Sequence, residues 1–260
     1  MKTCIAVMLL LFGCVCLAQA STEPGSHTQA AYPEPEAAAA WRGLAASYVR
    51  RALRDQTLEK DPALNARIDT VMASVATAVA AIDSRFVNSS WKAILIEDFG
   101  HGAAAFPGET ILVDAKFVRT LRLNDDELAM IFSHEVAHIV AGHASAKLSF
   151  MADFLGKEKV PTAHTALLEF LAKDSYAAVF QPRARLQERE ADTVGAAIFF
   201  ASGYASNRAL ELFDKLAELE AREDGRAAAS HDTARVRKQN VSRVIADLER
   251  FHGRRGPEPH

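Results

Sequence analysis

One stretch of the sequence, FSHEVAHIVAGH from Phe132 to His143, constrains the fold more than any other part of the chain. It places His134, Glu135 and His138 in a segment otherwise made mostly of Ile, Phe, Val and Ala. Burying a polar group without a partner costs on the order of 1 to 3 kcal/mol, so a core segment normally keeps such positions apolar. The fold must therefore supply something that satisfies these three side chains.

A helix is predicted to carry this stretch. Asn124 followed by Glu127 three residues later is a capping-box pattern, which marks a helix start. On that helix His134 and His138 are four residues apart and share one face, so they suit a single metal ion. Glu135 is turned by about 100° from His134 and falls on the apolar stripe of the helix. The polar group is therefore set into the wall of the core, as in a catalytic cleft.

The pattern H-E-x-x-H indicates zinc, with His134 and His138 as ligands and Glu135 as the general base that acts on the attacking water. The alternative is a pair of core histidines satisfied by other protein groups. A catalytic zinc ion takes a third protein ligand and keeps its fourth position open. The longer metzincin pattern would require glycine at 141 and histidine at 144, where this chain has Ala141 and Ala144. The third ligand must therefore come from another segment.

The segment LQEREAD offers that ligand. Glu188 and Asp192 are four residues apart on one face of a predicted helix, whereas Glu190 points roughly the other way. We expect Glu188 to bind zinc and Asp192 to accept the second ring N–H of a zinc-bound histidine. A surface helix with solvated charges is an equally open alternative. His143, five residues beyond His138 on one continuous helix, is expected on the surface.

The remaining pattern is mostly helical. The β-branched runs WKAILIED and TILVDA, separated by the glycine-containing FGHGAAAFPGE, predict a small antiparallel sheet beside the H-E-x-x-H helix. TILVDA is either an edge on which an extended substrate could pair or an ordinary covered strand. Asp61 and Pro62 mark the start of a long alanine-rich helix that runs to about Phe86. Further helices are predicted near 36–54, 163–173, 184–202, 206–223 and 231–251. The fold class is therefore α+β, and residues 144–187 are enough for a loop or helix that covers the cleft as a lid.

Two segments, ELAMIFSHEVAHIVAGH and EREADTVGAAIFFASGY, resemble those of metallopeptidase family forty-eight, the HtpX and CAAX-prenyl-protease type. The resemblance covers about residues 90 to 240. It implies a zincin-like domain of the gluzincin type that holds one zinc ion and hydrolyses peptide bonds. It also implies that Glu188 is a zinc ligand and that Asp192 supports the site. Among the members of this family, the chain is more similar to the soluble, exported bacterial branch.

The family also carries a histidine followed by proline, with an arginine six residues after the histidine. The segment SHDTARVR offers His231 and Arg237 at this spacing, with Asp232 in place of the proline. The resemblance therefore implies that His231 or Arg237 stabilises the oxyanion formed during hydrolysis. A helix start capped by Ser230 explains the same residues equally well.

The ends of the chain differ in composition from its middle. Residues 1–20 contain Lys2, an apolar run and the small-x-small pattern Ala18-Gln19-Ala20, which is typical of a signal peptide. A lipid anchor on Cys14 is the alternative for this segment. The predicted organisation is a signal peptide at 1–20, a flexible leader at 21–35, a single metallopeptidase domain at 36–252 and a loose tail at 253–260. We therefore expect an exported protein that works in the periplasm.

Composition narrows the function further. A net charge of −3, from 30 basic and 33 acidic residues, gives no indication of nucleic-acid binding. All three cysteines lie within residues 1–20, which disfavours a structural zinc site built from cysteines. We expect a zinc metalloendopeptidase for protein or peptide substrates of the cell envelope, in protein quality control, with peripheral membrane association left open. The alternative is a non-catalytic chaperone-like or assembly factor that keeps the zinc site, although such a protein has no need of Glu135.

Overall fold

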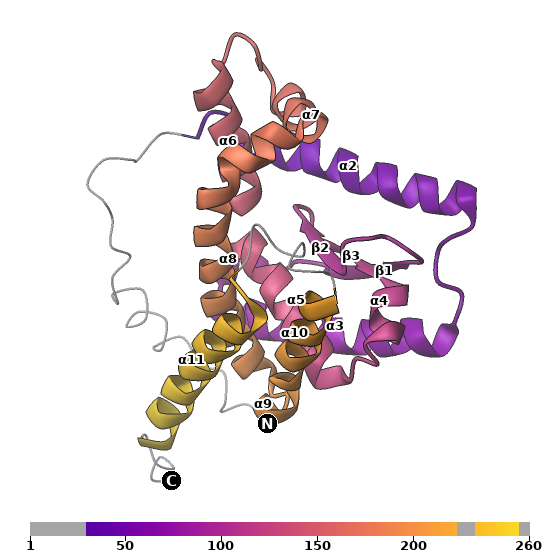
Figure 1. Ribbon diagram of the computed structural model, residues 1–260, viewed down its shortest axis with the longest axis vertical. Helices are drawn as coiled ribbons and strands as arrows, with labels where there is room; N and C mark the ends of the chain where they lie inside the picture. The colour runs from indigo at the N-terminus through magenta and orange to yellow at the C-terminus, as the bar shows by residue number, and fades with distance from the viewer. Residues whose placement is uncertain (1–29, 223–231, 255–260) are drawn as a thin grey trace.

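The computed structural model describes residues 30–222 and 232–254 of the 260-residue chain (Figure 1). The expected signal peptide, most of the leader, His231 and residues 255–260 lie outside the described residues. Within the described part, no helix is long and apolar enough to span a membrane. The elements, labelled as in Figure 1, are α2 (Glu34–Asp55), α3 (Pro62–Ile82), η1 (Ser84–Phe86), β1 (Lys92–Ile96), β2 (Ala103–Phe106), β3 (Thr110–Asp114), α4 (Ala115–Thr120), α5 (Asp125–Val140), α6 (His143–Leu155), α7 (Ala163–Ala172), α8 (Asp174–Ser202), α9 (Ser206–Ala209), α10 (Glu211–Arg222) and α11 (Ala234–Arg254).

The predicted α+β class is confirmed, but the sheet is mixed rather than antiparallel. Its strand order is β1-β3-β2, with β1 and β3 parallel and β2 antiparallel to β3. The two predicted strands run in the same direction because the chain reverses twice between them, once on each side of β2. Sequence reasoning missed β2 because its residues, AAAF, are mostly alanine, which has a weak strand preference.

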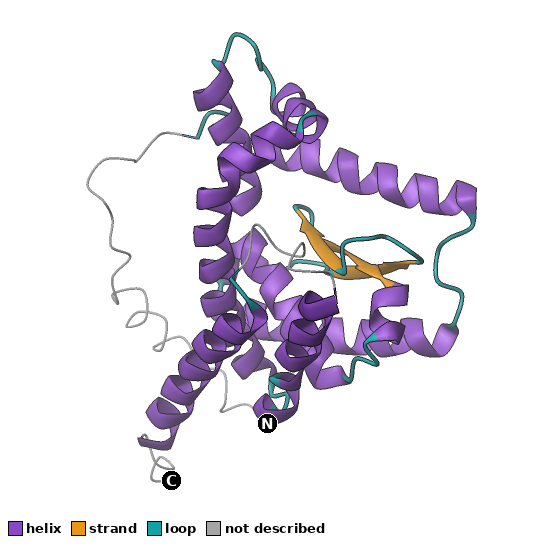
Figure 2. Cartoon of the chain, viewed as in Figure 1, coloured by secondary structure: helices purple, strands orange, loops and turns teal. Residues whose placement is uncertain are grey.

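The sheet separates two hydrophobic cores. Ile111 and Val113 of β3 pack into the core formed with α3, α5 and α8, while Leu112 between them packs into the core formed with α2, α6 and α7. This alternation is the period-two pattern of a strand that is buried on both faces. In Figure 2 the sheet accordingly lies between α2 and α3. Because both faces are covered, the sheet meets the functional cleft by an edge.

The start of α5 is the capping box that the sequence predicted. The Asn124 side chain accepts the Glu127 N–H, and the Glu127 carboxylate accepts the Asn124 N–H. Glu127 is fully buried, and Lys215 of α10 donates to its carboxylate at 2.7 Å. The cap therefore also ties α10 to the helix that carries His134 and His138.

Residues 144–187 form helices rather than a loop. They comprise most of α6, all of α7 and the first half of α8, which begins at Asp174 instead of near residue 184. Pro182 lies inside α8 and concealed this continuity, because proline normally interrupts a helix. At the other end of the chain, α11 continues to Arg254, two residues into the predicted tail.

Candidate metal centre

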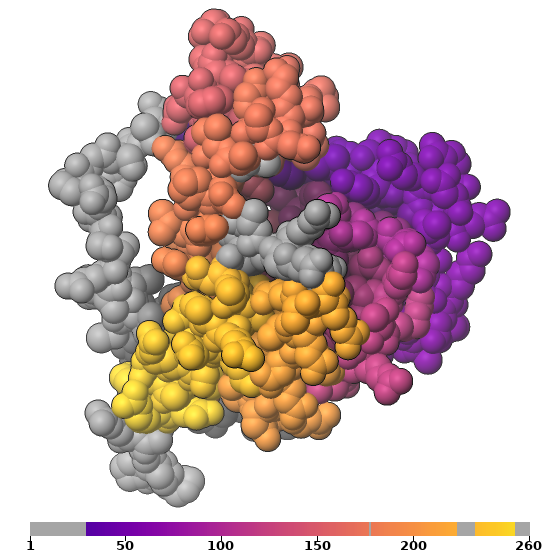
Figure 3. Space-filling model, in the orientation of Figure 1, coloured from indigo at the N-terminus to yellow at the C-terminus, as the bar shows by residue number. Residues whose placement is uncertain are grey.

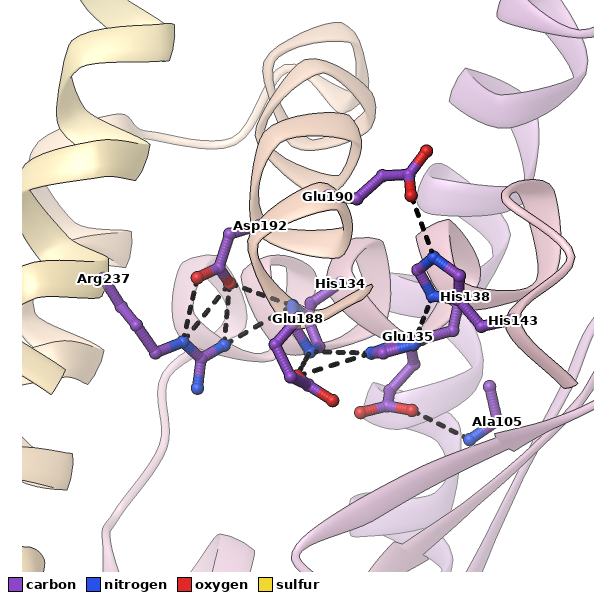
Figure 4. Close-up of polar contacts among 9 residues, drawn as sticks. All are labelled: Ala105, His134, Glu135, His138, His143, Glu188, Glu190, Asp192 and Arg237. Carbon is purple, nitrogen blue, oxygen red and sulfur yellow. Dashed lines mark hydrogen bonds and ion pairs between the residues drawn. The ribbon is translucent and has the colours of Figure 1, made fainter. Parts of the chain in front are cut away.

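Among the described residues, one group of three side chains has the arrangement of a metal site: His134 and His138 on α5, and Glu188 on α8 (Figure 4). The Nε2 atoms of the two histidines are 3.1 Å apart. Glu188 Oε2 lies 3.2 Å from His134 Nε2 and 3.6 Å from His138 Nε2. The three atoms form a triangle with nearly equal edges, referred to below as the ligand triangle.

The ligand triangle fits zinc. In a tetrahedral site with metal–ligand distances of about 2.0 to 2.1 Å, two ligand atoms lie about 3.3 Å apart. The three observed edges scatter around this separation. Two imidazole nitrogens and one carboxylate oxygen are also a known donor set of catalytic zinc, which leaves a fourth position open. The residues present therefore suit the ion that the sequence pattern indicates.

Behind His134 stands a buried ion pair. Asp192 Oδ1 lies 3.0 Å from His134 Nδ1, and Arg237 Nη2 donates to the same oxygen at 2.8 Å. A second bond joins Arg237 Nε to Asp192 Oδ2 at 3.0 Å. An ionised carboxylate only accepts hydrogen bonds, so His134 Nδ1 donates to Asp192, and Nε2, a corner of the ligand triangle, is the nitrogen left for a metal ion. Asp192 thus lies where the sequence prediction requires it.

The pKa values of these groups reflect this pairing. Burial alone would lower the pKa of His134, but the hydrogen bonds with Asp192 and Glu188 outweigh it and raise the pKa to about 9. Burial would raise the pKa of Asp192, but the bonds from His134 and Arg237 hold that pKa at about 2. Burial lowers the pKa of His138 despite its bond with Glu188. Without metal, His134 therefore holds a proton at neutral pH that a bound ion must displace.

The sequence prediction for His143 is wrong. Its side chain is buried, and its Nδ1 lies 2.9 Å from His138 Nδ1. The prediction assumed one continuous helix, but α5 ends at Val140, and Gly142, with a φ of 70°, redirects the chain so that α6 begins at His143. Glycine is the usual residue at such a left-handed position after a helix end. Gly142 is therefore the signal by which the position of His143 could have been found.

His143 links His138 to Glu190. Its Nε2 lies 3.2 Å from Glu190 Oε2, and this hydrogen bond lowers the pKa of Glu190. Because the carboxylate accepts, His143 Nε2 carries the proton and His143 Nδ1 is left to accept the Nδ1–H of His138. His138 Nε2, a corner of the ligand triangle, then carries no proton. Glu190 was expected to point away from Glu188, yet it reaches the site through His143.

Glu135 lies between the ligand triangle and the sheet, as Figure 4 shows. Its Oε2 accepts the backbone N–H of Ala105 at 2.8 Å. Ala105 belongs to β2, the edge strand of the sheet. This bond fixes the predicted general base beside a strand edge whose other main-chain groups face the cleft.

Glu188 comes close to α5 because α8 approaches that helix closely at Gly195. A Cβ atom at this position would lie 2.9 Å from the Cα of His134. Glu188, Asp192 and Gly195 follow one another at four and three residues, so they share one face of α8. The missing side chain at Gly195 therefore sets how near the two carboxylates come to the histidines.

These groups line a cavity of about 1220 Å³. Its walls include β2, α5, α6 and α8, with contributions from α2, α7, α10 and α11. In the view of Figure 3, α6 and α7 lie at the top, α10 and α11 at the bottom, and α2 at the right. The volume exceeds the roughly 300 to 1,000 Å³ of pockets for small molecules, so several residues of an extended peptide fit.

The two oxyanion candidates have different outcomes. Arg237 lines the cavity with its guanidinium bound to Asp192, whereas His231 lies outside the described residues. Asp232, which replaces the family's proline, pairs with Arg189 of α8 at 2.7 Å.

A helix with two histidines and a glutamate, a third ligand group in the carboxylate of a later helix and a strand edge beside the glutamate define the architecture of a zinc metallopeptidase. The model of peptidase family M48 matches residues 62–245. The chain therefore belongs to peptidase family M48, whose members are zinc-dependent metallopeptidases, as the sequence resemblance indicated. No relative among curated protein sequences matches the chain closely enough to add to this.

Proposed function

We propose that this chain is a zinc-dependent metalloendopeptidase with His134, His138 and Glu188 as its ligands. The observation that carries the proposal is the position of Glu135, whose carboxylate lies beside the ligand triangle and is bonded to an edge strand. A protein that used zinc only for structure, or that only bound clients, would gain nothing from a carboxylate at this point. Membership of family M48 supports the same conclusion.

The chemistry divides between the ion and the protein. Zinc, when bound, lowers the pKa of water from 15.7 to about 7 and polarises the scissile carbonyl. Glu135 takes the proton of the attacking water and passes it to the leaving amine. Asp192 and His143 hold the imidazole rings so that both Nε2 atoms are available to the ion.

We infer that the substrate pairs with β2. The segment TILVDA is β3, the central strand, so it is the covered strand of the two alternatives rather than the edge. β2 is an edge strand that lines the cavity, and the small side chains of Ala103, Ala104 and Ala105 let another main chain approach it. Pairing of this kind recognises the backbone more than the side chains of a substrate.

Arg237 and His231 are proposed as oxyanion stabilisers from the family spacing alone. Because Arg237 also holds Asp192, a test must separate the two roles. If Arg237→Lys lowers kcat while zinc affinity is unchanged, the oxyanion role is supported. If zinc affinity falls in step with kcat, Arg237 acts only by positioning Asp192.

The substrates that we propose are proteins of the bacterial envelope, processed in the periplasm as part of quality control. Support comes from the signal-peptide pattern in residues 1–20. A form anchored by lipid at Cys14 and a non-catalytic assembly factor that keeps the zinc site are the alternatives. Cells that express the full chain are fractionated. Detection of the protein in the periplasmic fraction supports the free form, and detection in the membrane fraction supports the form anchored by lipid.

The catalytic proposal is tested with residues 21–260, purified with and without Glu135→Gln and brought to equal zinc content. We expect the unsubstituted protein to cleave casein and the variant to lose at least about a hundredfold in rate, as is usual when a general base is removed. Equal zinc content is the control, because Glu135 is not one of the proposed ligands. If both proteins hold zinc and cleave casein at the same rate, Glu135 is not the base and the mechanism is wrong.

A further inference from the structure

Lys147 differs from the other charged residues beside the ligand triangle. It lies one turn after His143 on the same face of α6 and lines the cavity. Asp192 and Arg237 satisfy each other, and Glu135 accepts a backbone N–H. The partly buried Lys147 ammonium, by contrast, has no hydrogen bond or ion pair with another described residue. It is therefore a charged group in the cleft whose polar partner is to be sought in a ligand.

Three aromatic rings surround this ammonium. Lys147 Nζ lies 5.5 Å from the ring centroid of Trp41, 5.3 Å from that of Phe170 and 5.7 Å from that of Phe180. The rings come from α2, α7 and α8, and the Trp41 ring is fixed because its Nε1 donates to the Ala144 carbonyl at 3.1 Å. Ring faces attract the cation but do not replace full hydrogen-bond acceptors, so the three N–H donors of the ammonium stay available.

The charges near Lys147 do not use up this cation. Burial lowers the pKa of Lys147, while the charges of Glu188 and Glu135 act in the opposite direction. Glu188 belongs to the ligand triangle, and Glu135 is bonded to β2. A divalent ion in the triangle would offset these two carboxylates and lower the pKa of Lys147 further, so the charged ammonium would then depend on an anion beside it. Between apolar rings its attraction for an anion is stronger than it would be in water.

We propose that Lys147, with Trp41, Phe170 and Phe180, forms a subsite that binds a carboxylate of the substrate. The carboxylate comes either from an acidic side chain or from a free C-terminus, which present the same group. Charge-assisted hydrogen bonds join its oxygens to the ammonium, and the rings cover the apolar atoms next to it. The inference rests on the proposed peptidase function and adds the class of substrate: peptides with a carboxylate at one fixed position relative to the cleaved bond.

Binding is measured first, without zinc and without cleavage. The chain has two tryptophans, so Trp91→Phe leaves Trp41 as a fluorescent reporter within the subsite. The zinc-free protein, freed of chelator by dialysis, is titrated at constant ionic strength with three probes. N-acetyl-glutamic acid α-amide carries only a side-chain carboxylate, N-acetyl-alanine only a C-terminal carboxylate, and N-acetyl-alanine amide carries neither.

We expect a saturable change of Trp41 emission with one or both carboxylate probes and none with the amide. The change should be lost in Lys147→Met, retained in Lys147→Arg, and retained in the matched control Lys60→Met, which removes an exposed lysine outside the cavity. Equal thermal denaturation of the variants shows that the loss is not unfolding. Equal responses to all three probes, or an unchanged response in Lys147→Met, overturn the proposal.

Cleavage of a peptide mixture, read by mass spectrometry with the zinc-loaded protein, then separates this proposal from the proposed function. We expect acidic residues or C-termini to be enriched about tenfold at one position in the wild type and in Lys60→Met, and not in Lys147→Met. Carboxylate binding without any cleavage supports the subsite and contradicts the peptidase. Cleavage without enrichment of either acidic residues or C-termini at a fixed position supports the peptidase and contradicts the subsite.

Discussion

The two histidines of the ligand triangle are held from behind by two different structures. His134 contacts Asp192, which pairs with Arg237, and these two side chains are only 6% and 15% exposed. His138 contacts His143, which in turn contacts Glu190, and the side chain of Glu190 is 59% exposed. The first set of contacts, from His134 through Asp192 to Arg237, is called the His134 arm and ends in a buried ion pair between α8 and α11. The second set, from His138 through His143 to Glu190, is called the His138 arm and ends at the solvent.

Because of this difference, the two arms should contribute unequally to the free energy of unfolding. If either the buried carboxylate or the buried guanidinium is removed, the other is left as an unpaired charge inside the protein, which costs about 3 to 5 kcal/mol. A neutral imidazole with an exposed carboxylate at its far side leaves no buried charge when it is changed. The His134 arm should therefore stabilise both the site and the protein, while the His138 arm mainly orients a ring.

Removal of the charge of Asp192 should have the largest effect. In Asp192→Asn, Arg237 loses its buried anion and His134 its strong acceptor, so we expect a loss of about 3 to 5 kcal/mol in unfolding free energy. Zinc affinity should fall about 10- to 100-fold. Urea denaturation of the zinc-free protein and competition with a chromophoric chelator measure the two quantities.

A matched control exists for this change. Asp232→Asn breaks another carboxylate–arginine pair that involves α8, with Arg189, whose side chain is 57% exposed. We expect that change to cost less than about 1 kcal/mol and to leave zinc affinity unchanged. Equal effects of the two substitutions would contradict the importance of burial in the His134 arm.

The proton on His134 should give the next largest effect, in the zinc-free protein. Its folded-state pKa of about 9 lies above the ordinary 6.5, so its contribution to stability is complete below pH 6.5 and is lost as the pH rises through 9. We expect a loss of about 3 kcal/mol between pH 6.5 and 9 that is absent in His134→Gln. His138, whose pKa is lowered, acts only below pH 6.5 and in the opposite direction. Denaturation curves at a series of pH values test this, and a flat profile in the unsubstituted protein would sink it.

A smaller effect is expected from the other arm. His143→Leu removes the acceptor for His138 Nδ1–H, so His138 can take the wrong tautomer and zinc affinity should fall about tenfold. His143→Asn keeps an acceptor near the position of Nδ1 and should recover most of that affinity. Unfolding free energy of the zinc-free protein separates orientation from packing, and an equal loss of zinc affinity in both variants would assign His143 a packing role only.

The smallest effect is expected at Glu190. The oxygen of Gln in Glu190→Gln still accepts from His143 Nε2–H, and the side chain is largely exposed, so zinc affinity should change by no more than about threefold. The same chelator competition measures it. A loss as large as that of Asp192→Asn would show that the two arms are equivalent.

The position of Asp192 in the His134 arm could be predicted from the sequence, whereas its pairing with Arg237, which was expected to stabilise an oxyanion, and the whole His138 arm could not. Glu188 and Asp192 were found because both lie on one unbroken helix, where a spacing of four fixes a common face. His143 was missed because a helix ends between it and His138, and after Gly142 the spacing of five no longer describes an angle around one axis. Glu190 was missed with it, since it reaches the site only through His143.

The sheet and the subsite around Lys147 illustrate a second limit. β3 could be predicted from its β-branched residues, but β2 is defined by its pairing with β3, and its alanines do not specify a strand. Lys147 and its three rings come from four helices spread along the chain, so their meeting depends on tertiary packing. Local patterns predicted elements and their faces, while contacts between distant elements had to be observed.

The position of β2 has a consequence for solubility. A strand edge on the outside of a protein is a hazard, because the edge of another sheet can pair with it and begin aggregation. The free edge of β2 lies instead within a cavity bounded by helices. Such an edge has room for one extended chain but not for the rim of a folded sheet, so the walls of the cavity hinder association of folded copies through these main-chain groups.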